Sequence, residues 1–203
     1  INEFKKNLKD NYIKQDFDFK KLFYDHTKIV YNNIISQNIV FCEGYSIINN
    51  PFFKNLPVRG SKGEFLVVKI PNLNLDKIIK RSSIFIMPME NQFYWVGATY
   101  DNSDKKNRPT QLKKQWLIDR LESIIKEPYK IVEHKASIRP TTIDRRPITG
   151  SHPNYKNIYL LNGLGSRGIL LAPTISSWLY SHIYESSPIP KEVDIKRFKD
   201  NNS

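Results

Sequence analysis

Three glycines near the end of the chain have the spacing of a phosphate-binding loop. Gly163, Gly165 and Gly168 follow the pattern G-x-G-x-x-G, directly after the apolar run from Ile158 to Leu161. A strand, such a loop and a helix open the βαβ unit that binds dinucleotides, where amide N–H groups at the helix N-terminus hold a pyrophosphate. The spacing therefore suggests that this segment binds a phosphate or another negatively charged group.

The residues after the loop do not complete a dinucleotide site. Such a site needs a second parallel strand with an Asp or Glu about 20 residues after the glycines. Glu185 is at that distance but lies at the end of a predicted helix, and segment 186–203 contains no buried strand. We therefore interpret the loop as the last strand–loop–helix of a sheet. Its glycines either bring backbone close to a ligand, such as the negatively charged pyrimidine end of a reduced flavin, or allow tight packing.

Most of the chain before this loop has β-strand patterns. Short strands are predicted at Lys28 to Tyr31 and Asn38 to Cys42, and the second ends at Glu43-Gly44, a common place for backbone to approach a ligand or simply to turn. The β-rich stretches Gly63 to Ile70, Lys77 to Pro88 and Gln92 to Tyr100 predict an antiparallel meander. Another strand is expected from Tyr129 to Ile138, whereas residues 1–25 have a weak helical pattern.

Two helices are predicted among these strands. Pro109-Thr110 caps an amphipathic segment in which Leu117, Leu121 and Ile124 share one face. The second helix runs from about Ala172 to Glu185, with Pro173 in its first turn, where a missing N–H costs nothing. Strands packed by a helix, followed by a strand–loop–helix, indicate an α+β chain with a partial α/β character.

Composition limits the classes of protein. The 203 residues are 39% hydrophobic and 12% aromatic, which predicts a folded protein. No apolar run reaches the length of a membrane span and no signal peptide is visible, so we expect a cytoplasmic protein without a membrane partner. A lone Cys42 and scattered histidines give no support to a metal site. The net charge of +12 is compatible with a nucleic-acid partner or with an ordinary solvated lysine-rich surface.

The order of several short motifs resembles a known family. KGEFLVV, IFIMP, VGATYD, the first helix, SIRPTTIDRRPITGSHP and NIYLLNGLGSRGILLAP occur in that order. This order is similar to the carboxyl-terminal half of the FAD-dependent D-amino-acid oxidases, a family that includes glycine oxidase and sarcosine oxidase. GLGSRG followed by AP most resembles the oxidase domain of the bacterial tRNA methylaminomethyl-uridine modification enzyme.

The resemblance implies a domain arrangement. In this family an amino-terminal βαβ segment of the FAD domain is followed by an inserted substrate domain and then by a return to the FAD domain. We therefore expect the tail of the first FAD segment at 1–57, an antiparallel-sheet substrate domain with a helix at 58–142, and the carboxyl-terminal part of a Rossmann-like FAD domain at 143–203. Because the chain starts INEFKKN without Met, it is expected to be a piece of a longer oxidase whose amino-terminal FAD-binding segment is missing.

The resemblance also implies the chemistry. Relatives transfer a hydride from the carbon beside an amine nitrogen to FAD, which needs orientation of the substrate more than an acid or base, and we identify no acid–base residue. Arg139 occupies the place of the arginine that binds the substrate carboxylate, with a structural salt bridge as its alternative role. Phe85 stands where relatives often have a Tyr. Arg167 either supplies a second positive charge or faces solvent.

The expected FAD contacts are Glu43, Gly44, Gly163, Leu164, Gly165, Ser166, Arg167, Gly168 and Ile169. The expected substrate is a small amine or amino acid. Because the amino-terminal FAD-binding segment is expected to be missing, we do not expect these 203 residues alone to bind FAD well. Two alternatives stay open: an oxidase acting on carboxymethylaminomethyl-uridine in tRNA, and a binding module with no redox role.

Overall fold

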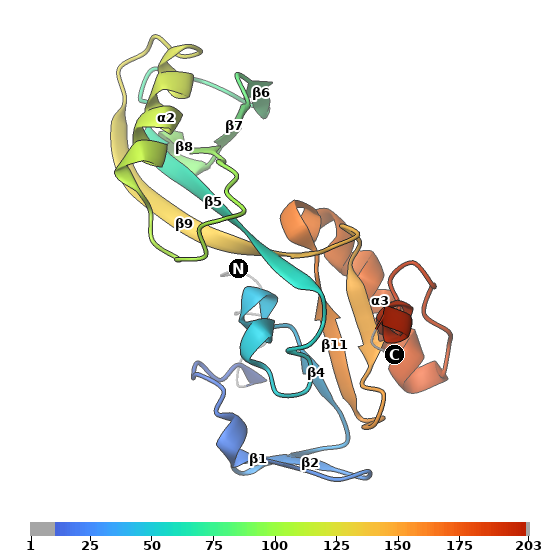
Figure 1. The fold of residues 1–203 in the computed structure, drawn as a ribbon. Coiled ribbons are helices and arrows are strands. Elements are labelled where there is room, and N and C mark those ends of the chain that lie inside the picture. Colours follow the sequence, from blue (N-terminus) through green and yellow to red (C-terminus); the bar gives the residue numbers. More distant parts are fainter. Residues whose placement is uncertain (1–10, 202–203) are drawn as a thin grey trace.

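The computed structural model describes residues 11–201 and has two lobes. Figure 1 shows one lobe built around helix α2 and the strands β5 to β9, and a second around β4, β11 and helix α3. The long strands β5 and β9 run through the first lobe and extend into the second. The two lobes therefore share a continuous piece of β-structure.

The first lobe contains a five-stranded antiparallel sheet in the order β6-β7-β8-β5-β9. Its strands are β5 (Val58–Lys69), β6 (Ile79–Arg81), β7 (Ile84–Pro88), β8 (Phe93–Gly97) and β9 (Lys130–Thr142). Helix α2 (Gln111–Glu122) packs against one face of this sheet, and the Thr110 hydroxyl accepts a bond from the Lys113 N–H at its N-terminus. Leu117 and Leu121 are fully buried there, as the helical spacing predicts.

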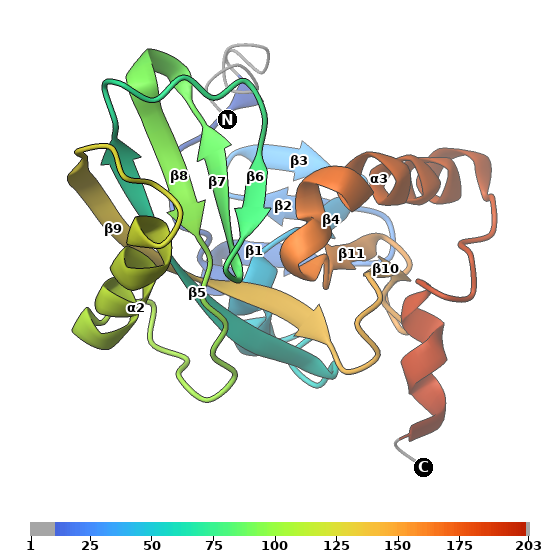
Figure 2. The ribbon, with the colours of Figure 1, turned by 90° about the horizontal axis from the view of Figure 1, so that it is seen from above.

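The second lobe combines a parallel and an antiparallel strand pair. Strand β11 (Ile158–Asn162) pairs in parallel with β4 (Ile39–Phe41) and antiparallel with β10 (Ile148–Ser151). Helix α3 (Gly168–Glu185) contacts β10 and β11 through buried Ile175 and Leu179, on the other side of the molecule from α2 in Figure 2. Because β4 and β11 are parallel, their carboxyl ends meet at one edge of the sheet.

Small elements complete the described chain. A three-stranded antiparallel sheet is formed by β1 (Leu22–Tyr24), β2 (Ile29–Tyr31) and β3 (Ile34–Ser36). The 3-10 helices are η2 (Phe19–Lys21), η3 (Gly44–Asn49), η4 (Glu90–Gln92), η5 (Gly165–Arg167) and η6 (Ile195–Asn201). Between residues 11 and 201, no helix combines the length and the apolar character needed to cross a membrane.

Two expectations from the sequence differ from the structure. The weak helical pattern of 1–25 is wrong where β1 forms at Leu22–Tyr24, because these residues pair with β2; residues 1–10 lie outside the described part. Within the predicted meander, the stretch Lys77 to Pro88 forms the hairpin of β6 and β7, which turns at Ser82 and Ser83, both with positive φ. Helix α3 begins at Gly168, so Pro173 lies in its second turn rather than its first.

Candidate active site

A cavity of about 850 Å³ lies where the two lobes meet. Its walls come from η3, from the beginning of β5, from the loop after β8, from the end of β9 and from the glycine loop. The lining residues include Tyr45, Arg59, Ser61, Tyr100, Asn102, Lys105, Arg139, Thr141, Arg145 and 163–167. Segments far apart in the sequence thus converge on one space, as is typical of ligand sites in enzymes of mixed structure.

Arg139 projects into this cavity from the end of β9. Its Nη1 donates to the backbone oxygen of Thr99 at 3.4 Å, and its guanidinium carbon lies 4.6 Å from the centre of the Tyr100 ring. The side chain is half-buried, and this burial lowers the pKa of the guanidinium from its usual value, although an arginine stays charged in proteins. Within residues 11–201, none of the ion pairs involves Arg139. The positive charge is therefore available to an anion in the cavity.

The three glycines of the loop have different roles. Gly163 has a φ of +70° and is buried; a Cβ there would lie 2.9 Å from the Thr142 methyl group, so this position is needed for packing. Gly165 has a φ of +57°, and a Cβ there would lie 3.5 Å from the nearest atom, the Thr141 hydroxyl oxygen. Gly168 has helical backbone angles and would hold a Cβ at ordinary contact distance from Leu164. Only Gly165 therefore combines a left-handed backbone with an open side on the cavity wall.

The ends of β4 and β11 are joined by side-chain bonds. The Asn162 amide donates to the backbone oxygen of Gly44 at 2.9 Å, and the Asn50 amide donates to the Glu43 carboxylate at 2.6 Å. Burial raises the pKa of Glu43 above its usual value. Gly44 has a φ of +59° and no atom within 4 Å of a Cβ built on it. Glu43 and Gly44 do not line the cavity, but Gly44 leaves open backbone beside the glycine loop.

The structure brings together only part of the expected site. Residues 163–167 and Arg139 line the same cavity, whereas Gly168 and Ile169 do not, and Ile169 is 97% exposed on α3. Arg167 is exposed and donates to the backbone oxygen of Arg145 at 3.4 Å. Phe85 is opposite Gly97, which is opposite Phe65, and Phe65 is opposite Lys135 in the sheet. Lys135 and Arg139 are four residues apart on β9, so Phe85 and Arg139 lie on the same face of the sheet. Phe85 is nevertheless outside the cavity lining.

Sequence patterns did not predict several lining residues. Among them are Tyr45, Arg59, Tyr100, Lys105 and Thr141. Tyr100 ends the predicted strand Gln92 to Tyr100, and Arg59 lies just before the predicted strand Gly63 to Ile70. A position at the end of a strand was the one sequence feature that could have marked either residue as part of a site. Which strand ends face each other depends on the sheet order, which the sequence does not reveal.

A family model described as FAD dependent oxidoreductase (DAO) matches residues 22–181. The chain belongs to this family. FAD is accordingly the cofactor of the family, and the resemblance inferred from the order of motifs is confirmed. The predicted fold class of the chain, α+β with a partial α/β character, is confirmed as well. The structure has an antiparallel sheet packed by a helix, and its structural neighbours are enzymes of the same family.

Individual relatives agree with this assignment. Glycine oxidase from Bacillus licheniformis is 31% identical over 140 residues, covering 68% of this chain and 37% of that protein. The tRNA 5-methylaminomethyl-2-thiouridine biosynthesis bifunctional protein MnmC from Idiomarina loihiensis is 25% identical over 154 residues, covering 71% and 25%. The structure of glycine oxidase from Geobacillus kaustophilus shares the fold with a TM-score of 0.69 and 21% identity, covering 83% and 48%. The chain thus spans a quarter to a half of the length of these relatives.

The residues present fit an FAD group. Gly44 and Gly165 offer left-handed backbone with space for a ligand to approach, at strand ends where α/β proteins bind nucleotides. Helix α3 begins at the last glycine of the loop, and the N-terminal end of a helix favours negative charge. The glycine loop and the Glu43-Gly44 corner are therefore the segments of this chain that could hold the cofactor.

Proposed function

We propose that this chain forms the substrate site and part of the flavin site of an FAD-dependent oxidase that oxidises the C–N bond of an amine carrying a carboxylate group. The observation that carries this proposal is Arg139: a half-buried guanidinium with no carboxylate partner among residues 11–201, in the cavity that the glycine loop also lines. Guanidinium groups in such surroundings bind carboxylates through paired charge-assisted hydrogen bonds.

Each part of the cavity has a separate task in this proposal. FAD supplies the hydride acceptor when it is bound. Arg139 holds the substrate carboxylate, which fixes the neighbouring C–H bond relative to the glycine loop. Phe85, which is 40% exposed on the same sheet face, offers an apolar surface without a hydroxyl group. No acid or base is assigned, because orientation of a neutral amine suffices.

The test is replacement of Arg139 in the FAD-loaded protein. Arg139→Gln should weaken binding of a carboxylate competitor such as glycolate by about 2 to 5 kcal/mol, because a charged contact is lost without compensation. Binding is measured by isothermal titration calorimetry, and kcat/KM for amino-acid substrates should fall in parallel. Arg139→Lys should recover only part of the affinity, since an ammonium group cannot pair with both carboxylate oxygens in the same plane. Unchanged glycolate binding in Arg139→Gln would remove this residue from the substrate site.

The charge of the cavity favours a second candidate, an oxidase whose substrate is a modified uridine in tRNA. In the part of the chain that the structure describes, the cavity is lined by five basic residues and by no Asp or Glu; the five are Arg59, Lys105, Arg139, Arg145 and Arg167. The neighbouring Asp144 is already paired with Arg197 at 2.9 Å. A substrate attached to phosphates suits this surplus of positive charge, and its binding should weaken steeply with salt.

We also propose that the domain boundaries lie at residues 57/58 and 142/143. Strand β5 begins at Val58 and β9 ends at Thr142, and the register pairs these two residues. A segment that enters and leaves through one strand pair is suited to insertion into another domain. Expression of residues 58–142 alone should then give a folded unit with a cooperative urea transition, and an unfolded product would contradict the boundaries.

A further inference from the structure

Tyr100 is the aromatic residue of the cavity that contacts Arg139. Its ring centre lies 4.6 Å from the guanidinium carbon, which is a cation–π distance. The side chain is nevertheless 63% exposed and lines the cavity. A large aromatic ring that touches the anion-binding group and leaves most of its surface open is placed to contact a ligand as well.

The backbone on both sides of Tyr100 is fixed to β5. The Thr99 N–H donates to the Glu64 oxygen at 3.0 Å, and the Glu64 N–H donates to the Thr99 hydroxyl at 2.9 Å. On the other side, Lys62 and Asp101 exchange two backbone bonds of 2.8 and 2.9 Å. The ring is therefore carried by a rigid segment although the residue itself is exposed.

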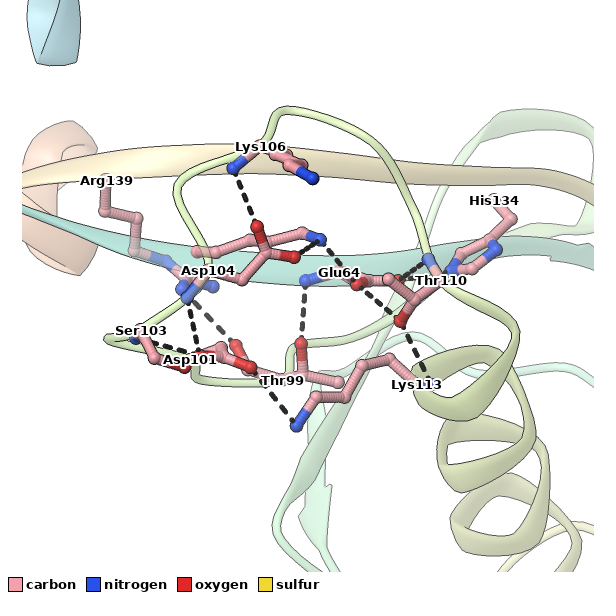
Figure 3. A network of polar contacts seen from close by, with 11 residues as sticks. Glu64, Thr99, Asp101, Ser103, Asp104, Lys106, Thr110, Lys113, His134 and Arg139 are labelled. Atoms are coloured by element: carbon pink, nitrogen blue, oxygen red, sulfur yellow. Dashed lines mark hydrogen bonds and ion pairs between the residues drawn. The ribbon is translucent and has the colours of Figure 1, made fainter.

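A buried network of charges holds the loop that follows. Figure 3 shows Glu64 and Asp104 in this network, with Thr110 and the start of α2 at one end and Arg139 at the other. The Lys62 side chain is only 2% exposed, and its ammonium nitrogen lies 3.1 Å from Glu64 and 2.7 Å from Asp104. The Glu64 carboxylate also accepts bonds from the Thr110 N–H at 2.8 Å and its hydroxyl at 3.0 Å. The bonds of Lys62 and Glu64, on one face of β5, thus fix the loop after β8. The same loop carries Tyr100, which contacts Arg139 on the opposite face.

The guanidinium is confined from a second direction by Gly63. A Cβ at this position would lie 2.1 Å from Nη2 of Arg139, so the guanidinium lies directly over the glycine backbone. Ser61, two residues earlier on the same face, pairs with Arg139 in the register. Arg139 is consequently held by contacts with Tyr100, Gly63 and the Thr99 oxygen. Its Nε and Nη2 atoms have no hydrogen-bond partner among residues 11–201, which leaves them for a ligand.

We propose that Tyr100 determines substrate specificity: its ring fixes the Arg139 guanidinium and forms the wall that the group next to the bound carboxylate contacts. This inference rests on the proposed function of Arg139. It assigns the preference to the ring and not to the hydroxyl group, since the ring makes the observed contact. The substrates favoured are carboxylates with a flat or apolar group beside the carboxylate, because such groups pack well against an aromatic face.

The experiment compares two inert carboxylates in the FAD-loaded protein. Glycolate and benzoate are titrated by calorimetry into the wild type, Tyr100→Phe, Tyr100→Ala and Arg139→Gln. Tyr180→Ala is the matched control, because Tyr180 is 60% exposed on α3 and outside the cavity lining. Urea unfolding of each variant checks that the fold is kept.

We expect Tyr100→Ala to lower the preference for benzoate over glycolate by about three- to ten-fold, as the loss of an aromatic contact predicts. Glycolate binding itself should weaken a few-fold as the guanidinium loses its stacking partner. Tyr100→Phe and Tyr180→Ala should both stay within two-fold of the wild type.

Two results would reject the role of Tyr100 without rejecting the proposed function of Arg139. One is an unchanged preference in Tyr100→Ala while Arg139→Gln abolishes glycolate binding. The other is a Tyr100→Phe variant that behaves like Tyr100→Ala, which would assign the effect to the hydroxyl group. Unchanged glycolate binding in Arg139→Gln would instead reject the proposed function, and the role of Tyr100 with it.

Discussion

Two glycines show how one residue type serves different purposes. Gly163 has a left-handed backbone and is packed against Thr142 and Ile148, so a side chain there would collide with the core. Gly63 has no positive φ, and a side chain there would meet the far end of a flexible arginine, Arg139. The first glycine is required by the fold and the second by the position of the guanidinium.

Gly63→Ala should consequently separate binding from stability. The new methyl group displaces the Arg139 guanidinium, so glycolate affinity should fall at least about ten-fold, the scale of one lost charge-assisted bond. The free energy of unfolding in urea should change by less than about 0.5 kcal/mol, because a flexible side chain can move aside.

Gly163→Ala provides the opposite case. Its backbone strain and its contact with Thr142 should cost about 1 to 3 kcal/mol of stability. Equal loss of stability in the two variants, measured by urea unfolding, would contradict the separate roles assigned to them.

Strand β5 serves a different purpose on each of its faces. Lys62 and Glu64 point toward the α2 side and form the buried network, whereas Ser61 and Gly63 face the side of Arg139. Because successive side chains of a strand point to opposite faces, one strand can position a site on one side and anchor its supporting loop on the other. This explains why the strand sequence VRGSKGEFL contains small and charged residues as well as apolar ones.

The network makes stability depend on pH. Burial alone would raise the pKa of Glu64, but the bonds from Thr110 and the ion pair with Lys62 outweigh it, so this pKa lies below its usual value. A carboxyl with a lowered pKa contributes stability that is complete above about pH 4.3 and is lost as the pH falls below it.

Glu64→Gln should accordingly cost about 1 to 3 kcal/mol at pH 7, the scale of a lost buried charged bond. The loss of stability between pH 5 and pH 3 should also be smaller than in the wild type, measured by urea unfolding at several pH values. Glu133→Gln, an exposed residue on β9, is the control. Parallel pH profiles for wild type and Glu64→Gln would show that this carboxyl is not held ionised by the network.

At the scale of the whole molecule, the site belongs to neither lobe alone. The first lobe supplies Arg139 and Tyr100, and the second supplies the glycine loop, which is joined to β9 by a bridge between Thr141 and Leu164. The pairing of β5 with β9 along their whole length sets the distance between these parts. The same junction concentrates the basic residues of the cavity.

This concentration gives a test of the tRNA candidate. If Arg59 and Arg145 each neutralise a phosphate, replacing either with Gln should weaken tRNA binding and reduce the slope of log affinity against log salt by about one. Binding of the FAD-loaded protein is measured by fluorescence anisotropy from low to physiological salt. Lys77→Gln is the control, since Lys77 is exposed and lies outside the cavity lining. Absence of tRNA binding even at low salt would reject this candidate.

Local patterns in the sequence were sufficient to predict most element types and the family. β-rich and apolar runs predicted β5, β8 and β11, and apolar residues on one helical face predicted both long helices, because these patterns are local. The absence of a strand pattern after the glycine loop agrees with the structure, where η6 is the element that follows α3 between residues 186 and 201. The order of motifs then identified the FAD-dependent family.

The set of residues that share the site follows from strand pairing and could not be predicted from local patterns. Strand β1 and the β6–β7 hairpin depend on pairing partners that local patterns do not specify. Tyr100 reached Arg139 because the order β8-β5-β9 places their strands on either side of β5 and a buried network fixes the connecting loop. Contacts between residues about forty positions apart are set by sheet order and register, and these are properties of the folded chain rather than of any segment.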